Sequence, residues 1–277
     1  MDLEMAIEEA FDSGAGAGSE KDLTVLFTRL MEGLNSGRIR AAEKCGEEWR
    51  THPWVKKGIL LGFRIGRLQD MSAAGGFPFF DKDTFPVKAI GPEDGVRIVP
   101  GGSSIRDGAY IGRGVTCMPP MYINVGAYVD DGAMIDSHAL VGSCAQIGKR
   151  VHISAASQIG GVLEPVGSLP VIIEDDVLIG GNCGIYEGTV VSARAVIGAG
   201  TVITGATPVY DLVRDAVHVR SESGPLVIPP NAVVVPGSRP ISQGWGRELG
   251  LHVYSPVIVK YRDEKTEKSI RLEDWLR

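Results

Sequence analysis

The chain has 277 residues, 44% of them hydrophobic and only 6% aromatic, so it can bury a core built mainly from aliphatic side chains. Its formal charge of −6 and pI near 5.5 argue against a nucleic-acid-binding protein, which needs a basic face to neutralise phosphates. No run approaches eighteen apolar residues, and the acidic start lacks the cationic and apolar regions of a signal peptide. We therefore predict a soluble, cytoplasmic protein.

Residues 1–100 are non-repetitive and are expected to form a small α/β domain. Residues 6–11 look helical, a glycine-alanine segment at 14–18 interrupts the pattern, and Ser19 with Asp22 resembles a capping box that opens a second helix. The apolar positions of this second helix are Leu23, Leu26, Phe27, Leu30 and Leu34. The segments that follow, at 38–44 and 49–65, suggest a strand, a turn and a helix.

Residues 101–235 carry a rhythm with a period of six. An aliphatic residue, or a cysteine in its place, occupies every sixth position for ten sextets, at Ile105, Ile111, Cys117, Ile123, Val129, Ile135, Val141, Ile147, Ile153 and Ile159. The rhythm resumes at Ile173, continues to Val209 and returns at Ile228 and Val234. A small residue follows four positions after most of these, and Gly, Asp or Asn is frequent in between.

A period of six fits neither an α-helix nor an alternating strand, and indicates a solenoid whose repeat is one short strand plus one turn. Three sextets close one triangular coil, with the aliphatic residue inside, the small residue at the corner, and Gly, Asp or Asn in turns with positive φ. Successive coils stack at about 4.8 Å in parallel ladders. We predict a mainly β fold, a left-handed parallel β-helix of about six coils; the less favoured alternative is an irregular Gly-rich β-sandwich.

The rhythm breaks at residues 160–171 and 211–227. Insertions in a solenoid leave it as loops on one face, which is often the binding face. The tail, residues 236–277, contains a strand candidate at 253–261 and a short helix around 272–276. This C-terminal extension is expected to cover the open end of the stack.

Neither the cysteines nor the histidines show the spacing of a metal site. The four cysteines lack a C-x-x-C pair, and Cys117 and Cys183 occupy inward positions, where a reduced thiol acts as a small hydrophobe. A zinc enzyme on this fold needs three converging histidines, but of the five only His138 and His152 lie in the continuous repeat. We predict no metal and a reducing compartment.

Several segments resemble one family of hexapeptide-repeat acyltransferases. Inside the repeat they read MYINVGAYVD (121–130), MID (134–136), VGSCAQIG (141–148), IGGVLEP (159–165) and IIED (172–175). Outside it they read RAAEK (40–44), THPWVKK (51–57), FDK (80–82), VRIVP (96–100) and VIVK (257–260). Together they resemble the 2,3,4,5-tetrahydropyridine-2,6-dicarboxylate N-succinyltransferases of the lysine and diaminopimelate pathway over nearly the whole chain.

The resemblance implies transfer of succinyl from succinyl-CoA, a co-substrate, to the amino group of the ring-opened substrate, 2-amino-6-oxopimelate. No permanently bound cofactor is implied. An amine with a pKa near 10 must lose a proton before it attacks a thioester, so a positioned carboxylate is a sensible base. No nucleophilic side chain is needed if the amine meets the thioester in one ternary complex. The family also implies a homotrimer with one site at each interface, since a single prism offers only a shallow groove.

The resemblance assigns the catalytic carboxylate to Asp136, which is also expected to contact the acceptor; a structural turn residue is the alternative at this position. Arg97 matches the family arginine that binds a substrate carboxylate, and a guanidinium suits a dicarboxylate. Its alternative is a surface arginine at a domain junction. A second family glutamate falls at Gly184, so either Glu187 or a rearranged site supplies that group, or one carboxylate suffices; otherwise Glu187 is a solvated turn residue.

Other assignments are open at this point. Many family members have Trp at the position of His138, which can assist proton transfer but more often packs facing solvent. CoA is a polyanion, so we expect basic groups to bind it: Lys260 first, with Arg262, Arg239 and Arg220 as further candidates. The alternative activities are CoA-dependent N-acetyl transfer to the same or a related amino dicarboxylate, and a scaffold without activity.

Overall fold

The computed structural model describes residues 2–13, 20–72, 76, 78–221 and 224–263. The helices are α1 (Leu3–Asp12), α2 (Glu20–Asn35), α3 (Pro53–Ile65) and α4 (Gly244–Glu248), with a 3-10 turn η1 (Pro92–Asp94). No helix in these ranges is long and apolar enough to cross a lipid bilayer. The glycine-alanine segment, Ser19 of the expected capping box and the expected helix at 272–276 lie outside the described residues.

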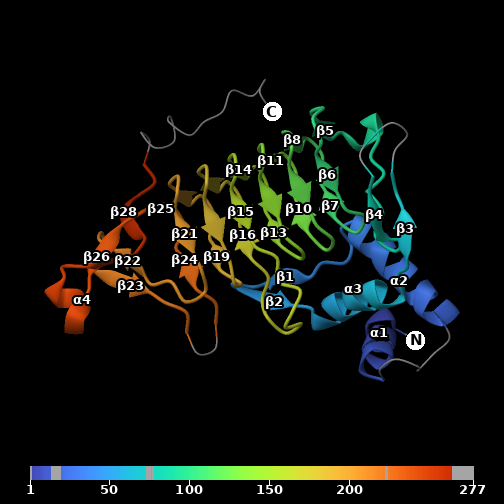
Figure 1. The fold of residues 1–277 in the computed structure, drawn as a ribbon, viewed down its shortest axis with the longest axis horizontal. Coiled ribbons are helices and arrows are strands. Elements are labelled where there is room, and N and C mark those ends of the chain that lie inside the picture. The colour runs from blue at the N-terminus through green and yellow to red at the C-terminus, as the bar shows by residue number, and fades with distance from the viewer. Residues whose placement is uncertain (1, 14–19, 73–75, 77, 222–223, 264–277) are drawn as a thin grey trace.

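Most of the described chain forms a three-sided parallel β-helix, drawn as the row of stacked strands in Figure 1. Tyr128 pairs with Tyr110 on one side and Gln146 on the other, so the partners are 18 residues apart. Three sextets therefore close one coil, and the predicted parallel ladders between coils are present. Two of the three sheets have six strands, in agreement with the expected number of coils.

We name the three sheets in the order in which the chain visits them from β6 onward. Sheet I contains β6 (Ser104–Ile105), β9 (Tyr122–Ile123), β12 (Leu140–Val141), β15 (Gln158–Ile159), β18 (Gly184–Ile185) and β21 (Val202–Ile203). Sheet II contains β7 (Tyr110–Ile111), β10 (Tyr128–Val129), β13 (Gln146–Ile147), β16 (Ile172–Ile173), β19 (Val190–Val191) and β24 (Val227–Ile228).

Sheet III is the longest, and its ladder begins at Arg97. It contains β5 (Arg97–Ile98), β8 (Thr116–Cys117), β11 (Met134–Ile135), β14 (His152–Ile153), β17 (Leu178–Ile179), β20 (Val196–Ile197), β25 (Ala232–Val235), β28 (Val257–Tyr261), β22 (Val209–Asp211) and β23 (Ala216–His218). The corner from sheet I to sheet II is called the insertion corner below. The corner from sheet III to sheet I is called the Asp136 corner.

The repeat residues build the interior as expected. Ile135, Ile147 and Ile153 are fully buried and belong to one cluster that runs through the prism. Small residues such as Ala139 lie at the corners, where a larger side chain has no room. Turn residues such as Asn182, with φ of 56°, adopt the left-handed conformation that Asn tolerates well.

Two local predictions are wrong. The rhythm places Val209 in the next sheet II strand, but Ile228 pairs with Val191 there, and Val209 belongs to β22, which lies between β23 and β28 in sheet III. The chain between Ile203 and Val227 leaves the prism, so it is not bound to the coil's register. The single strand expected at 253–261 is divided at Ser255 and Pro256 into β27 (His252–Tyr254) and β28. Proline lacks the N–H that a continuous ladder requires.

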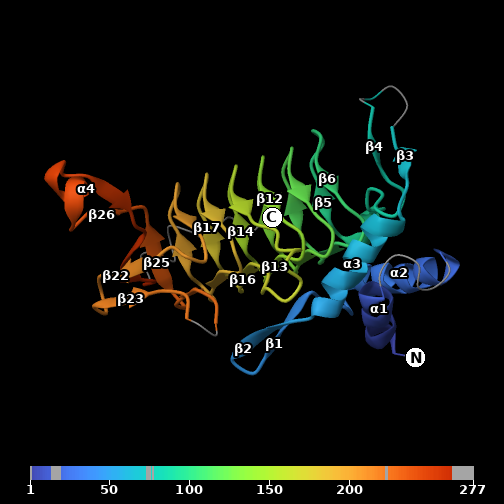
Figure 2. The ribbon, with the colours of Figure 1, turned by 60° about the horizontal axis from the view of Figure 1, so that its bottom comes forward.

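The two ends of the prism are covered by different elements. At the first end α1, α2 and α3 share a second hydrophobic core that also contacts Val125 and Cys144 of the insertion corner (Figure 2). The hairpin of β1 (Ala42–Cys45) and β2 (Glu48–Thr51) lies against sheet II, where Ala42 packs on Ile172 and Val190. A second hairpin, β3 (Leu68–Asp70) with β4 (Phe80–Lys82), projects from the first end of the prism on the opposite side in Figure 2. The strand, turn and helix expected within 38–44 and 49–65 correspond to β1, the turn after it and α3, whereas β2 is an additional strand.

The tail covers the other end of the stack, as predicted. β28 pairs antiparallel with β25, and Ile258 is fully buried in the prism core. The hairpin of β26 (Ser238–Pro240) and β27, with α4 between them, extends beyond the last coil (Figure 1). Neither β26, the pairing of β27 with it, nor α4 was predicted from the sequence.

The cysteines provide a simple test of the packing. Cys117, Cys144 and Cys183 are buried and Cys45 is exposed; none is in a disulfide. Burial raises the pKa of Cys117 and of Cys144 to about 12, which suppresses the reactive thiolate. We expect a thiol reagent to label one cysteine in the native protein and four after unfolding. Native labelling that persists in Cys45→Ser would contradict the burial of the other three.

Candidate active site

Both insertions leave the prism at the insertion corner. Residues 160–171 connect β15 of sheet I to β16 of sheet II, and residues 204–226 connect β21 of sheet I to β24 of sheet II. The ladder nevertheless continues across each insertion, because Gln146 pairs with Ile172 and Val190 pairs with Val227. The expectation that the insertions occupy one side of the solenoid is confirmed.

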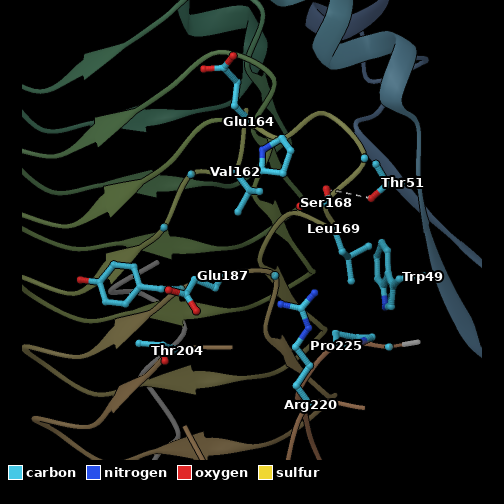
Figure 3. A pocket seen from close by; sticks show the side chains of 17 residues that line it. Trp49, Thr51, Val162, Glu164, Ser168, Leu169, Glu187, Thr204, Arg220 and Pro225 are labelled. Carbon is cyan, nitrogen blue, oxygen red and sulfur yellow. Dashed lines mark hydrogen bonds between the residues drawn. The ribbon is translucent and has the colours of Figure 1, made fainter. Parts of the chain in front are cut away.

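A cleft of about 810 Å³ lies between the two insertions and β2 (Figure 3). Gly160 to Leu169 supply much of one wall, Trp49 and Thr51 of β2 contribute from the side, and Arg220 comes from the second insertion. Tyr186 and Glu187, from the corner that follows β18, complete it. The cleft thus joins parts of the chain that are far apart in the sequence.

Arg220 and Glu187 are the charged groups nearest the centre of this cleft. In Figure 3 the Arg220 guanidinium extends into the space between Glu187 and Trp49. Glu187 has φ of 54°, and its Oε2 accepts a hydrogen bond of 3.1 Å from the N–H of Gly205. Glu187 is therefore both a turn residue and a cleft residue, so the two interpretations of it from the sequence are compatible.

A fully buried lysine holds the first insertion in place. Lys56 of α3 has no exposed surface, and its ammonium donates a 2.5 Å hydrogen bond to the carbonyl of Ser168. The hydroxyl of Thr51 donates to the same carbonyl at 3.4 Å. Burial lowers the pKa of Lys56, since the charged form loses solvation. These contacts explain structurally why the THPWVKK segment matters to the cleft.

The carboxylate of Glu174, which directly follows β16 of sheet II, holds the β1–β2 hairpin at the side of the cleft. Glu174 Oε1 accepts hydrogen bonds from Lys44 Nζ at 2.7 Å and from Trp49 Nε1 at 2.9 Å. Burial alone would raise the pKa of Glu174, but these two donors and the N–H of Ala193 lower it on balance. The indole of Trp49 is thereby oriented along the cleft. Sequence reasoning did not identify Lys56 or Trp49 as supports, although both lie in or near the family-like segments.

Tyr186 occupies the space beside Gly184. Gly184 points outward from β18, and a Cβ added to it would lie 2.5 Å from the Tyr186 ring carbon Cε2. A glutamate at this position therefore requires the ring to move. The ring of Tyr186 lines the cleft, and the carboxylate of Glu187, three residues after Gly184, lines it as well.

Asp136 lies at a different corner from Glu187. It directly follows β11, and its side chain is 30% exposed, so it is neither sealed in the prism nor fully in solvent. Its Oδ1 accepts a 2.7 Å hydrogen bond from the N–H of Ser137, and its Oδ2 lies 3.7 Å from His152 Nε2. One chain therefore does not bring its two candidate carboxylates into a single site.

The other candidates are spread along the prism. Arg97 is on β5 of sheet III, two ladder steps or roughly 10 Å from the strand that precedes Asp136. Lys260 is exposed on β28 of the same sheet and forms a 3.6 Å ion pair with Asp263. Arg262 donates to the carbonyls of Asp176 and Arg194, so it holds the corner between sheets II and III.

The positions of Arg239 and His138 and the test for a metal site narrow the set of candidate site residues. Arg239 is exposed on β26, and it is not among the residues that line the cleft. His138 is exposed at the Asp136 corner with φ of 61°, so it serves as a turn residue. Within the described ranges, no three His, Cys, Asp or Glu side chains are grouped closely enough to hold a metal ion.

Comparison with known proteins places this geometry in a family. Residues 2–65 match the family model described as the N-terminal part of tetrahydrodipicolinate N-succinyltransferase, and residues 170–205 match the hexapeptide repeat of succinyl-transferase. Relatives named 2,3,4,5-tetrahydropyridine-2,6-dicarboxylate N-succinyltransferase come from several bacteria. The one from Sodalis glossinidius is 40% identical, covering 99% of this chain and 98% of the relative.

Two further relatives agree. The protein from Legionella pneumophila is 41% identical, covering 99% of this chain and 97% of its own. The protein from Nitrosospira multiformis is 43% identical, covering 99% and 98%. The similarity thus includes the N-terminal helices and the tail as well as the repeats. The chain belongs to the family of 2,3,4,5-tetrahydropyridine-2,6-dicarboxylate N-succinyltransferases.

Proposed function

We propose that this enzyme transfers a succinyl group from succinyl-CoA to the amino group of ring-opened tetrahydrodipicolinate, 2-amino-6-oxopimelate, in diaminopimelate and lysine biosynthesis. The observation that carries the proposal is full-length identity of about 40% to N-succinyltransferases. Because the match includes the non-repetitive parts, it is more than the general likeness of one hexapeptide prism to another.

In the proposed reaction the amine attacks the thioester directly. Asp136 accepts a proton from the ammonium, and the freed nitrogen adds to the thioester carbonyl carbon. The tetrahedral intermediate then loses a second proton from this nitrogen and expels the CoA sulfur as a thiolate. The thiolate takes up one proton to give the thiol, the other proton passes to solvent, and an amide remains. The partial exposure of Asp136 supports this role, since its carboxylate is open to a substrate while Ser137 holds its other oxygen. Arg97, on the same sheet, is the proposed partner of an acceptor carboxylate.

We propose a homotrimer in which the Asp136 corner of one chain faces the insertion corner of the next. The separation of Asp136 and Glu187 onto different corners supports this arrangement, because the two carboxylates can share a site only across an interface. Succinyl-CoA serves as a co-substrate, with Arg220 in the cleft and Lys260 on β28 as proposed phosphate contacts. Lys260 lies five ladder steps, roughly 24 Å, from the strand before Asp136, so only an extended donor can reach both. The proposed compartment is the cytoplasm, where free cysteines such as these persist.

The test is release of CoA thiol from succinyl-CoA with L-2-aminopimelate as acceptor. We expect acceptor-dependent thiol release and formation of the N-succinyl product. Acetyl-CoA is the comparison donor, because the alternative function is N-acetyl transfer to the same or a related amino dicarboxylate. A preference for acetyl-CoA would replace the proposed donor, and no acceptor-dependent release from either thioester would exclude an acyltransferase.

Arg220→Ala tests the cleft directly. A hydrogen bond to a charged group contributes about 1.5–3 kcal/mol, so we expect KM for succinyl-CoA to rise about tenfold to a hundredfold with little change in kcat. Arg239→Ala is the matched control, because Arg239 is also an exposed arginine but lies on β26 and not at the cleft. Equal effects of the two substitutions on KM would show that general charge, rather than the cleft, attracts the donor.

A further inference from the structure

A second titratable side chain faces the Asp136 carboxylate from the next coil. β14 pairs with β11 so that His152 is opposite Met134 and Ile153 is opposite Ile135. The N–H of Asp136 donates a 2.9 Å hydrogen bond to the carbonyl of Ile153. The backbone that carries the carboxylate is therefore fixed to the backbone that carries the imidazole. This ladder sets His152 Nε2 3.7 Å from Asp136 Oδ2.

The two oxygens of Asp136 have different surroundings. Oδ1 accepts the hydrogen bond from the Ser137 N–H, and Oδ2 faces the imidazole. The side chains are 30% exposed for Asp136 and 16% exposed for His152. An interaction between groups that are partly removed from water is screened less than one on an open surface. At 3.7 Å the two groups are within ion-pair range but longer than a hydrogen bond, so a small approach would let the imidazole limit rotation of the carboxylate.

We propose that His152 is a positioning residue for Asp136, an inference that rests on the proposed function. When its Nε2–H comes within hydrogen-bonding distance, it turns Oδ2 toward the bound amine, whose proton that oxygen accepts. His152 itself forms no bond with either substrate. The role needs a hydrogen-bond donor at this place on β14, and it requires neither a metal nor a second nucleophile.

His138 provides a comparison within the same corner. It follows Asp136 by two residues, its side chain is exposed, and its backbone N–H donates a hydrogen bond to the Pro120 carbonyl in the turn. Two histidines therefore lie near the proposed base, but the recorded contact with its carboxylate comes from His152. The chain itself thus offers a control for general effects of removing an imidazole from this corner.

The experiment compares His152→Leu with His152→Gln. Leucine fills similar space without a donor and is already tolerated on this face, since Leu178 is the next residue in the ladder. A general base contributes about 10²–10⁴-fold, and we expect loss of its orientation to remove tenfold or more of that from kcat, with KM for succinyl-CoA unchanged. His152→Gln, which retains an N–H donor, should recover part of the loss. His138→Asn, which suits the positive φ of this turn, should leave kcat close to that of the parent.

A double mutant separates this inference from the proposed function. In an Asp136→Asn background, His152→Leu should cause little further loss, because a positioning residue has nothing left to position. An equal loss in both backgrounds, or parental kcat in His152→Leu, would overturn the inference while succinyl transfer by the parent remained established. Absence of succinyl transfer in the parent would instead refute the function. Thermal unfolding of each variant distinguishes a misfolded protein from an inactive site. If His152→Leu does not fold, a higher kcat in His152→Gln than in His152→Asn supports a distance-dependent donor, and equal kcat in both overturns the inference.

Discussion

Asp136→Asn is expected to lower kcat for succinyl transfer by about 10²–10⁴-fold, the usual contribution of a general base. The amide has nearly the same shape as the carboxylate, and its oxygen can still accept the hydrogen bond from the Ser137 N–H. It cannot accept the proton of an ammonium at neutral pH. The loss should therefore appear in kcat while the thermal unfolding temperature and the subunit number stay as in the parent. Thiol release, thermal unfolding and light scattering measure these three quantities.

Asp130→Asn is the matched control. Asp130 stands one sextet earlier, and its Oδ1 makes the equivalent short turn contact, accepting a 2.8 Å hydrogen bond from the N–H of Asp131. It follows β10 of sheet II, so it lies at a different corner of the prism. We expect this variant to keep the parent's turnover. Full activity in Asp136→Asn would remove Asp136 from its proposed role, and equal losses in both variants would indicate damage to the turns.

Ile153→Ala is expected to destabilise the protein by about 2–5 kcal/mol, as is typical when a large aliphatic side chain is removed from a packed core. Ile153 is fully buried, and it pairs with Ile135 in the coil before and Ile179 in the coil after. The prism has little freedom to close the resulting cavity, because both neighbouring coils are fixed by their ladders. Equilibrium denaturation measures the change, provided the unfolding is reversible.

Val202→Ala is the control for orientation. Val202 also lies in a two-residue strand, β21, but its side chain faces outward and is 40% exposed. We expect a change in unfolding free energy of about 0.5 kcal/mol or less, which is normal for surface substitutions. Comparable losses at Ile153 and Val202 would contradict the assignment of alternate residues to the inside and the outside of the prism.

The regular part of the fold follows from the sequence because one small unit is repeated. Once Ile135 and Ile153 are inward residues one coil apart, every intervening side chain has a defined direction. The period of six no longer predicts the structure where the chain leaves the prism. Val209 keeps the spacing of six and is buried, yet it lies in β22 of sheet III. The period of six carries no information about a segment that has left the coils of the prism.

The candidate site, like the fold, could be predicted from the sequence only in part. Asp136 was identified through a motif, and its neighbour His152 follows from the coil length, since a separation of 16 residues is one coil less two residues. The cleft was not accessible to such reasoning. Lys56 reaches Ser168 across 112 residues of sequence, and Trp49 reaches Glu174 across 125. Contacts of this length depend on how the helices dock on the prism, which no local pattern specifies.

The two excursions at the insertion corner have a consequence for how this scaffold can change. The ladder interval is 18 residues in coils without an insertion, such as residue 128 to 146, but it lengthens from residue 146 to 172 and from 190 to 227 without any slip in the stacking. Chain length at this edge is therefore decoupled from the geometry of the column. Substitutions, additions or deletions here can alter which molecules are recognised while the rest of the architecture stays constant, so new selectivity can arise in this enzyme at little risk to its folding.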